Sequence, residues 1–130
     1  MIFTVEGEPR GKQRPRLTRS GIVYTPSETT RYEKSVKAAY LMAGGRKING
    51  PVKVTVWAFL KIPASKSAKA RAQMRGEPAT KKPDIDNILK IILDGLNGAA
   101  YEDDKQVVEA VVYKGYRPEP SVSVDVEAVI

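Results

Sequence analysis

Residues 81–106 read KKPDIDNILKIILDGLNGAAYEDDKQ and contain the most regular apolar pattern of the chain. Apolar residues recur at the i, i+3, i+4 and i+7 positions that share one face of an α-helix, namely Leu89, Ile92, Leu93 and Leu96, with Ile88 and Ile91 beside them. Gly98 follows, and glycine readily takes the left-handed conformation that ends a helix. The pattern predicts a helix over residues 87–97 with one buried face.

The same stretch holds six of the fifteen acids of a chain whose net charge is +7, namely Asp84, Asp86, Asp94, Glu102, Asp103 and Asp104. Carboxylates that lie close together repel one another, so a bound divalent cation is the simplest reason to keep such a cluster. The chain has no His and no Cys, which excludes Ser-His and Cys-His nucleophiles and the usual zinc ligands. Oxygen ligands for a hard cation such as Mg²⁺ or Mn²⁺ remain.

Two aspartates stand before the predicted helix. Pro83 disfavours helical geometry at the residue that precedes it, so we expect an extended segment in which Asp84 and Asp86 share one face and Ile85 points to the core. Either aspartate could instead cap the helix that begins at Asn87. Two acids on one face, followed by more acids downstream, favour a ligand role over capping.

Asp86, Lys90 and Asp94 are spaced by four and form one stripe opposite the leucines. From this spacing alone, the preferred interpretation of Lys90 is an ordinary exposed ion pair worth about 0.3–0.5 kcal/mol. The helix covers about 16 Å, and the steps from Gly98 to Asp104 reach at most about 20 Å. The later acids can therefore return to the earlier ones only if the loop runs back along the helix.

The remaining sequence predicts an α+β fold, with residues 1–130 forming a single small domain. Alternating apolar residues predict strands over 2–5, 52–62, 107–114 and 122–130, which would form a mixed sheet of about four strands. This sheet would be backed by two main helices, residues 87–97 and residues 27–43. The buried stripe expected for the second helix is Tyr32, Val36, Ala39, Tyr40 and Ala43.

The sequence also predicts the structure of three further segments. Trp57 and Phe59 lie on the second face of the strand over 52–62, which indicates that this face is covered near the strand's end. Residues 10–27 have no apolar period and are predicted to be a loop. Residues 65–75 have only Ala68, Ala72 and Met74 to bury, so we expect a short, weakly docked helix inside a mobile basic loop.

Lys and Arg gather in two segments. Residues 10–19 have a net charge of +5 with no acid, and residues 61–82 have a net charge of +6, so the other residues sum to −4. This separation favours a polyanion such as nucleic acid as the partner, although a solvated surface with a flexible arm is the alternative. The candidate DNA contacts are Arg10, Lys12, Arg14, Arg16, Lys66, Lys69, Arg71, Lys81 and Lys82.

The composition also bounds the location of the protein. No apolar stretch approaches the ~20 residues that span a bilayer, and the first residues lack the pattern of a signal peptide. Absence of cysteine fits a cytosolic protein. We therefore expect a cytoplasmic protein with no membrane contact and no organic cofactor.

The chain resembles the RusA-type Holliday junction resolvases, in particular their Gram-positive and phage-like branch. The resemblance rests on KPDIDNILKIILDGLNG followed by YEDDKQV, within residues 82–107, and more weakly on GKQRPR and YTPSETTRYE in residues 11–33 and on IPASKS at 62–67. It implies a RusA-like fold and a homodimeric, magnesium-dependent endonuclease that cuts four-way DNA junctions in recombination and repair, with Mn²⁺ as a possible substitute.

Residue by residue, the resemblance implies that Asp84, Asp86 and Asp104 are metal-binding catalytic acids and that Asp103 is an auxiliary acid. It also makes Lys90 a catalytic lysine, against the ion-pair interpretation. Which of Asp103 and Asp104 is the main ligand stays open. Such a site would hydrolyse a phosphodiester with a carboxylate or metal-held hydroxide as base, while Lys90 stabilises the developing charge.

Two other functions compete with the resolvase. One is a nucleic-acid-binding module in which the acids only cap helices or hold structural metal, so that aspartate-to-asparagine changes would leave its activity intact. The other is a metal nuclease for flaps or single strands, which a panel of DNA substrates would distinguish. The length and specificity of the central motif favour the resolvase.

Overall fold

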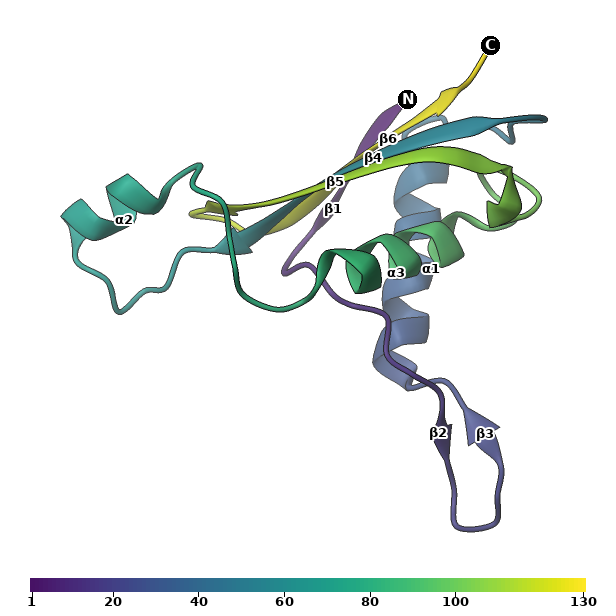
Figure 1. The fold of residues 1–130 in the computed structure, drawn as a ribbon, viewed down its shortest axis with the longest axis horizontal. Helices are drawn as coiled ribbons and strands as arrows, with labels where there is room; N and C mark the ends of the chain where they lie inside the picture. Colours follow the sequence, from purple (N-terminus) through teal and green to yellow (C-terminus); the bar gives the residue numbers. More distant parts are fainter.

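β4 (Val52–Lys61) organises the sheet in the computed structural model, which describes residues 1–130. It pairs antiparallel with β6 (Ser121–Ala128) and parallel with β5 (Val107–Arg117), and β1 (Ile2–Glu6) pairs antiparallel with β6. The strand order is β1-β6-β4-β5 (Figure 1). This mixed four-stranded sheet confirms the predicted α+β class and the four predicted strands.

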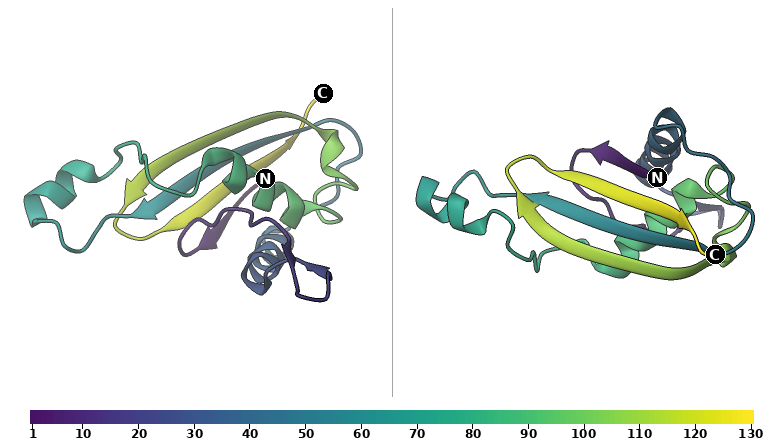
Figure 2. Two further views of the ribbon diagram at one scale, coloured as in Figure 1. Left: turned by 60° about the horizontal axis from the view of Figure 1, so that its bottom comes forward. Right: turned by 90° about the horizontal axis from the view of Figure 1, so that it is seen from above.

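Two helices, α1 (Ser27–Met42) and α3 (Ile85–Leu96), cover one face of the sheet (Figure 2). The side chains that fill this interface are fully buried or nearly so, and include Val52, Val54, Val56, Val122, Val124, Val36, Tyr40, Ile88, Ile91, Ile92 and Leu96. Burying one such aliphatic side chain stabilises the fold by about 1.5–3 kcal/mol. The contact between sheet and helices is therefore the main source of stability, and it fixes the position of α3.

The other face of the sheet is covered only near the end of β4. Phe59 is 8% exposed and lies beneath the guanidinium of Arg117, whose Cζ is 3.7 Å from the ring centroid. Trp57, further back along β4, is only partly buried. The prediction that this sheet face is covered near the end of the strand is confirmed, because Arg117 covers Phe59 there.

α3 belongs to the crossover that a parallel pair such as β4 and β5 requires. The chain leaves β4, passes through α2 (Ala68–Met74) and then α3, and reaches β5 through a 3₁₀ turn, η1 (Asp104–Gln106). Gly98 has a φ of +82°, as predicted for the residue after this helix. The crossover thus brings the later acids back to the helix that begins with the earlier ones.

Details of both helices differ from the sequence prediction. α3 begins at Ile85, whose side chain is 54% exposed rather than directed to the core, because the helix starts two residues early and turns it outward. Ile88 and Ile91 are buried more deeply than Leu89, because α1 packs against α3 at Gly95 and rotates the buried face toward the isoleucines. In α1, Ala43 is exposed because the helix ends at Met42.

Two arms extend from this body (Figure 1). Residues 10–27, predicted to be a loop, instead contain a hairpin of β2 (Arg16–Leu17) and β3 (Val23–Tyr24). Strands of two residues are too short to leave an alternating pattern, which explains the miss. The other arm carries α2, which buries no residue, as expected of a weakly docked helix. No helix of the protein combines the length and the apolar character needed to cross a membrane.

Candidate active site

Asp84 occupies the position immediately before α3, where an aspartate commonly caps a helix, but its side chain makes no capping hydrogen bond. Asp86 lies in the first turn and is exposed. Neither carboxylate forms an ion pair within the chain. The capping interpretation is therefore not realised by hydrogen bonding, and both carboxylates keep oxygen lone pairs for a ligand.

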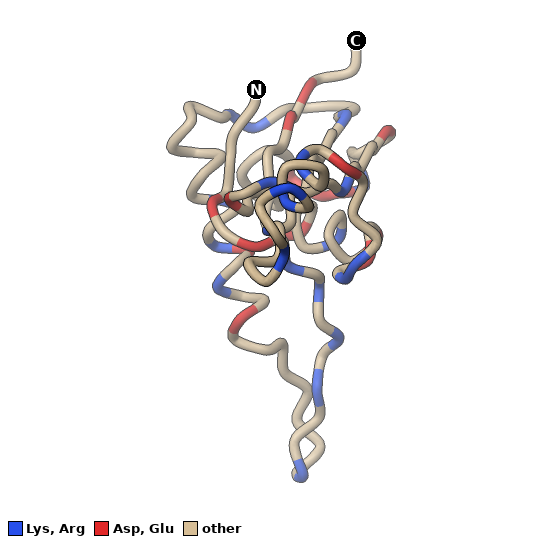
Figure 3. Tube along the Cα trace, turned by 90° about the vertical axis from the view of Figure 1, so that its left-hand side faces the viewer, with Lys and Arg blue, Asp and Glu red and all other residues tan.

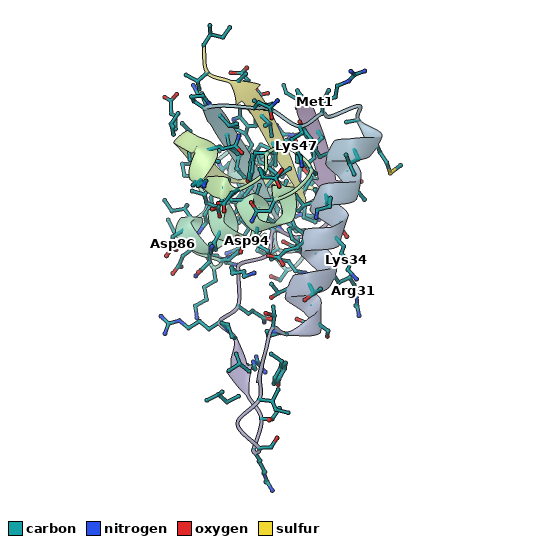
Figure 4. All side chains as sticks on the ribbon, turned by 90° about the vertical axis from the view of Figure 1, so that its right-hand side faces the viewer. Met1, Arg31, Lys34, Lys47, Asp86 and Asp94 are labelled. Atoms are coloured by element: carbon teal, nitrogen blue, oxygen red, sulfur yellow. The ribbon has the colours of Figure 1, made fainter.

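Lys90 joins the two ends of the motif. Its Nζ lies 3.2 Å from Oδ1 of Asp94 and 3.9 Å from Oδ2 of Asp104. The ion pair expected from the spacing of Lys90 and Asp94 is present, but the lysine also reaches an acid fourteen positions further along the chain. Asp86 and Asp94 lie on the side of the sheet from which the hairpin projects (Figure 4).

The loop after α3 is held back along the helix by specific contacts. The hydroxyl of Tyr101 donates a 2.7 Å hydrogen bond to the carbonyl of Leu93, and Tyr101 itself is fully buried. Burial raises the pKa of this hydroxyl, and the nearby carboxylates of Asp104, Asp94 and Asp103 raise it further. Tyr101 therefore stays neutral and can anchor the return of the acids, as the length of the loop required.

Asp103 and Asp104 have different environments. Asp103 caps η1 by accepting a 2.9 Å hydrogen bond from the amide of Lys105, which is the main reason why the pKa of its carboxyl is lowered. Burial raises the pKa of Asp104, and so does the hydrogen bond with Asp103, while Lys90 opposes both. The carboxylate of Asp103 is thus hydrogen-bonded to the backbone. Asp104 instead faces Lys90 and the carboxylates of Asp103 and Asp94, whose negative charge a bound cation would neutralise.

The donor chemistry of this cluster fits a hard divalent cation, because every candidate ligand is a carboxylate oxygen. In this structure, however, no three acids lie close enough together to hold a metal ion. The structure brings Asp104 to Lys90 and Asp94, but it does not close Asp84, Asp86 and Asp104 into one ligand set. That ligand set therefore stays a prediction.

Lys12, a candidate DNA contact, lies against the protein. Its Nζ is 2.7 Å from Oε2 of Glu33 in α1 and 3.0 Å from Oδ2 of Asp94 in α3, and its side chain is 22% exposed. Burial lowers the pKa of Lys12, but hydrogen bonds and attraction to the two carboxylates outweigh burial and raise it. The lysine thus links both helices and shares Asp94 with Lys90. This link could not be predicted from the sequence, because no spacing relates residues 12, 33 and 94.

The other basic candidates lie on or near the two arms. Arg10, Arg14, Arg16, Lys66, Lys69, Lys81 and Lys82 are exposed, and Arg71 is partly buried. Figure 3 shows Lys and Arg along the hairpin arm, with no Asp or Glu on its projecting part. α3, with its acids, lies between the hairpin and α2 (Figure 1). This arrangement can attract an anionic polymer to the acids from two sides.

Comparison with known proteins gives two matches. The family model described as "Endodeoxyribonuclease RusA" matches residues 6–127. The chain is also 36% identical over 138 residues to the uncharacterized protein YqaN of Bacillus subtilis (strain 168), a match that covers 98% of this chain and 95% of that protein.

Proposed function

Because this chain belongs to the RusA family of endodeoxyribonucleases, we propose that it resolves four-way DNA junctions by magnesium-dependent, paired phosphodiester hydrolysis in recombination and repair. Family membership makes the chain a crossover junction endodeoxyribonuclease. The magnesium requirement, the biological role and a homodimeric state are the parts that we propose. The observation that supports the proposal is the position of Lys90. Its ammonium lies near the carboxylate of Asp94 in α3 and near the carboxylate of Asp104 in η1.

Asp84, Asp86 and Asp104 would hold the cation, with Asp103 as an auxiliary acid, and Mn²⁺ could replace Mg²⁺ because both prefer oxygen ligands. The bound cation would neutralise phosphate charge and lower the pKa of the attacking water. With no histidine in the chain, a carboxylate of the cluster takes the proton of that water. The water oxygen bonds to phosphorus as the bond from phosphorus to the leaving oxygen breaks, and the proton taken up by the carboxylate then passes through solvent to that leaving oxygen.

Lys90 acts on the phosphate in this proposal. Its side chain is 56% exposed, so it can reach a substrate, and its contact with Asp94 orients it across the cluster. A positive charge fixed beside the reacting phosphate stabilises the negative charge that develops in the transition state. Asp94 positions Lys90 and is itself held by Lys12.

The basic side chains of the two arms would bind phosphates away from the cut, which positions the DNA without reading its sequence. Arg14 and Arg16 are exposed at the base of the hairpin, and Lys66 and Lys69 at the start of the α2 arm. Lys81 and Lys82, which Pro83 separates from Asp84, are also exposed. They would guide the DNA backbone toward the acids.

A homodimer would present two identical sites to a substrate with two-fold symmetry. The sheet face that the helices leave uncovered supports this, since Trp57 lies beside Tyr113 on it and Val111 and Tyr113 are 47% and 37% exposed. The outer side of α3 is the other surface considered, but it carries the charged and exposed Asp86 and Lys90. We therefore propose the Trp57 face as the interface.

The test is a substrate panel of synthetic four-way junction, duplex and flap DNA, with Mg²⁺ or with EDTA. We expect the wild-type protein to cut the junction when Mg²⁺ is present and not in EDTA. The Asp86→Asn variant should not cut the junction in either condition. Preference for the flap would replace the resolvase with a flap nuclease. Binding of the junction without cutting under any metal would leave only a nucleic-acid-binding module.

A further inference from the structure

The β2–β3 hairpin exposes more apolar surface than an arm that only contacts phosphates requires. Its side chains Leu17, Ile22, Val23 and Tyr24 are 70%, 62%, 63% and 45% exposed. The hairpin projects away from the body (Figures 1 and 4). An isolated hairpin of this size is at best marginally stable in water. Its apolar side chains add nothing to the stability of the fold while they remain in solvent. This surface needs a partner.

The hairpin is nonetheless a built structure with two distinct faces. Leu17 pairs with Val23 on one face, and Arg16 pairs with Tyr24 on the other. At the tip, the amide of Thr18 donates to the carbonyl of Ile22 at 2.9 Å, and the amide of Ile22 donates to Oγ1 of Thr18 at 3.0 Å. One face is thus wholly apolar and the other combines a cation with an aromatic ring.

Charge identifies the partner. Arg14, Arg16 and Arg19 lie on the arm, and residues 9–27 contain no acid. A second copy of this chain also carries a net charge of +7, so contact between the two arms would bring like charges together. An anionic partner that also offers apolar flat surfaces fits both properties, and the exposed faces of DNA bases provide them.

The arm is anchored at the candidate active site. The amide of Lys12 donates a 2.9 Å hydrogen bond to the carbonyl of Asn87, in the first turn of α3, and the ammonium of Lys12 binds Asp94. From Lys12 to Ser20 the chain spans at most about 26 Å when extended. The tip can therefore reach base pairs near the phosphate that the acids would cut.

We propose that this hairpin is a wedge that contacts the unstacked bases at the branch point of the DNA. The inference rests on the proposed function, because it places the branch point beside the acids. Leu17 and Val23 insert against exposed base faces, as apolar side chains of DNA-bending proteins do, and Tyr24 stacks on a base. Stacking is already interrupted where the arms meet, so opening costs less there than within a duplex. The arginines contact the flanking phosphates.

The experiment uses a four-way junction with 2-aminopurine next to the branch point, and a matched junction with the probe inside one arm. Binding to the wild-type protein in EDTA should brighten the branch-point probe much more than the arm probe. The Leu17→Ser/Val23→Ser variant should lose most of that difference at saturation. Its preference for junction over duplex should fall at least about fivefold, which is the lower end of what one stacking contact contributes.

A matched control removes two exposed apolar side chains elsewhere. The Leu41→Ser/Met42→Ser variant, at residues that are 52% and 87% exposed, should behave like the wild type. Equal brightening of both probes by the bound wild-type protein overturns the wedge, and so does full brightening by the hairpin variant. A hairpin variant with altered sedimentation and unchanged fluorescence would assign the surface to a second copy instead. Junction cutting with Mg²⁺ reports separately on the proposed function, which survives a failure of the wedge alone.

Discussion

Replacing Gly95 with Ala should destabilise the protein, although the same change stabilises most helices. Gly95 lies inside α3, where alanine is favoured over glycine by about 1 kcal/mol. A Cβ at this position would lie 2.9 Å from Cβ of Val36 and 3.0 Å from the carbonyl oxygen of Glu33 in α1. The second atom belongs to the backbone and cannot rotate away. Overpacking of this kind costs about 1–3 kcal/mol, and we expect its upper range here.

The net effect is a loss of about 1–2 kcal/mol in the free energy of unfolding, which corresponds to a fall of about 4–8 °C in Tm. Urea and thermal unfolding followed by circular dichroism measure both. Ser35→Ala, on the exposed side of α1, is the control and should leave stability nearly unchanged. A Gly95→Ala variant more stable than the wild type would show that helix propensity wins, and would refute the close approach of α1 and α3.

Further outcomes follow from the site. Asp104→Asn should abolish cutting while junction binding in a mobility-shift assay is kept or tightened, because the change removes a proposed metal ligand and a charge that repels phosphate; near-normal cutting would remove Asp104 from the proposed ligand set. Lys90→Ala should lower turnover in single-turnover assays without weakening metal binding, and unchanged turnover would return Lys90 to a surface ion pair. Replacing Arg14 and Arg16 together with Ala should flatten the dependence of log K on log salt by about 0.9 per lost phosphate contact, and an unchanged slope would mean that both face solvent. Tyr32→Phe should keep or raise stability at neutral pH, because the buried hydroxyl has no hydrogen-bond partner. Burial raises the pKa of Tyr32 from 10.0 to about 12, so the wild type should lose stability from pH 10 to 12 as unfolded tyrosine ionises, and the variant should lose less; an equal loss would contradict this burial.

The helices and strands whose apolar residues repeat regularly over many positions were predictable from the sequence. The alternation in β4 and the leucine and isoleucine pattern of α3 extend over ten or more residues and are confirmed. The exact buried face of α3 was not predictable, because it depends on Gly95 packing against α1. The β2–β3 hairpin was missed since each of its strands has two residues.

The site shows a similar division. The motif identified Asp84, Asp86 and Asp104 as candidate ligands, and the loop length correctly required the chain to return along α3. The role of Lys12 was not visible, because tertiary packing alone brings it to Asp94. The difference between Asp103 and Asp104 also needed the structure, which shows that only Asp103 caps η1.

The most direct test of the account is a map of the cuts in a four-way junction built from four distinct strands, each labelled in turn and incubated with the protein and Mg²⁺. A homodimer with one acid cluster per subunit should cut two opposed strands at positions related by the two-fold symmetry of the junction. The products should be nicked duplexes that DNA ligase seals. Cuts confined to one strand, or cuts at unrelated positions that ligase does not seal, would contradict paired hydrolysis at the branch point.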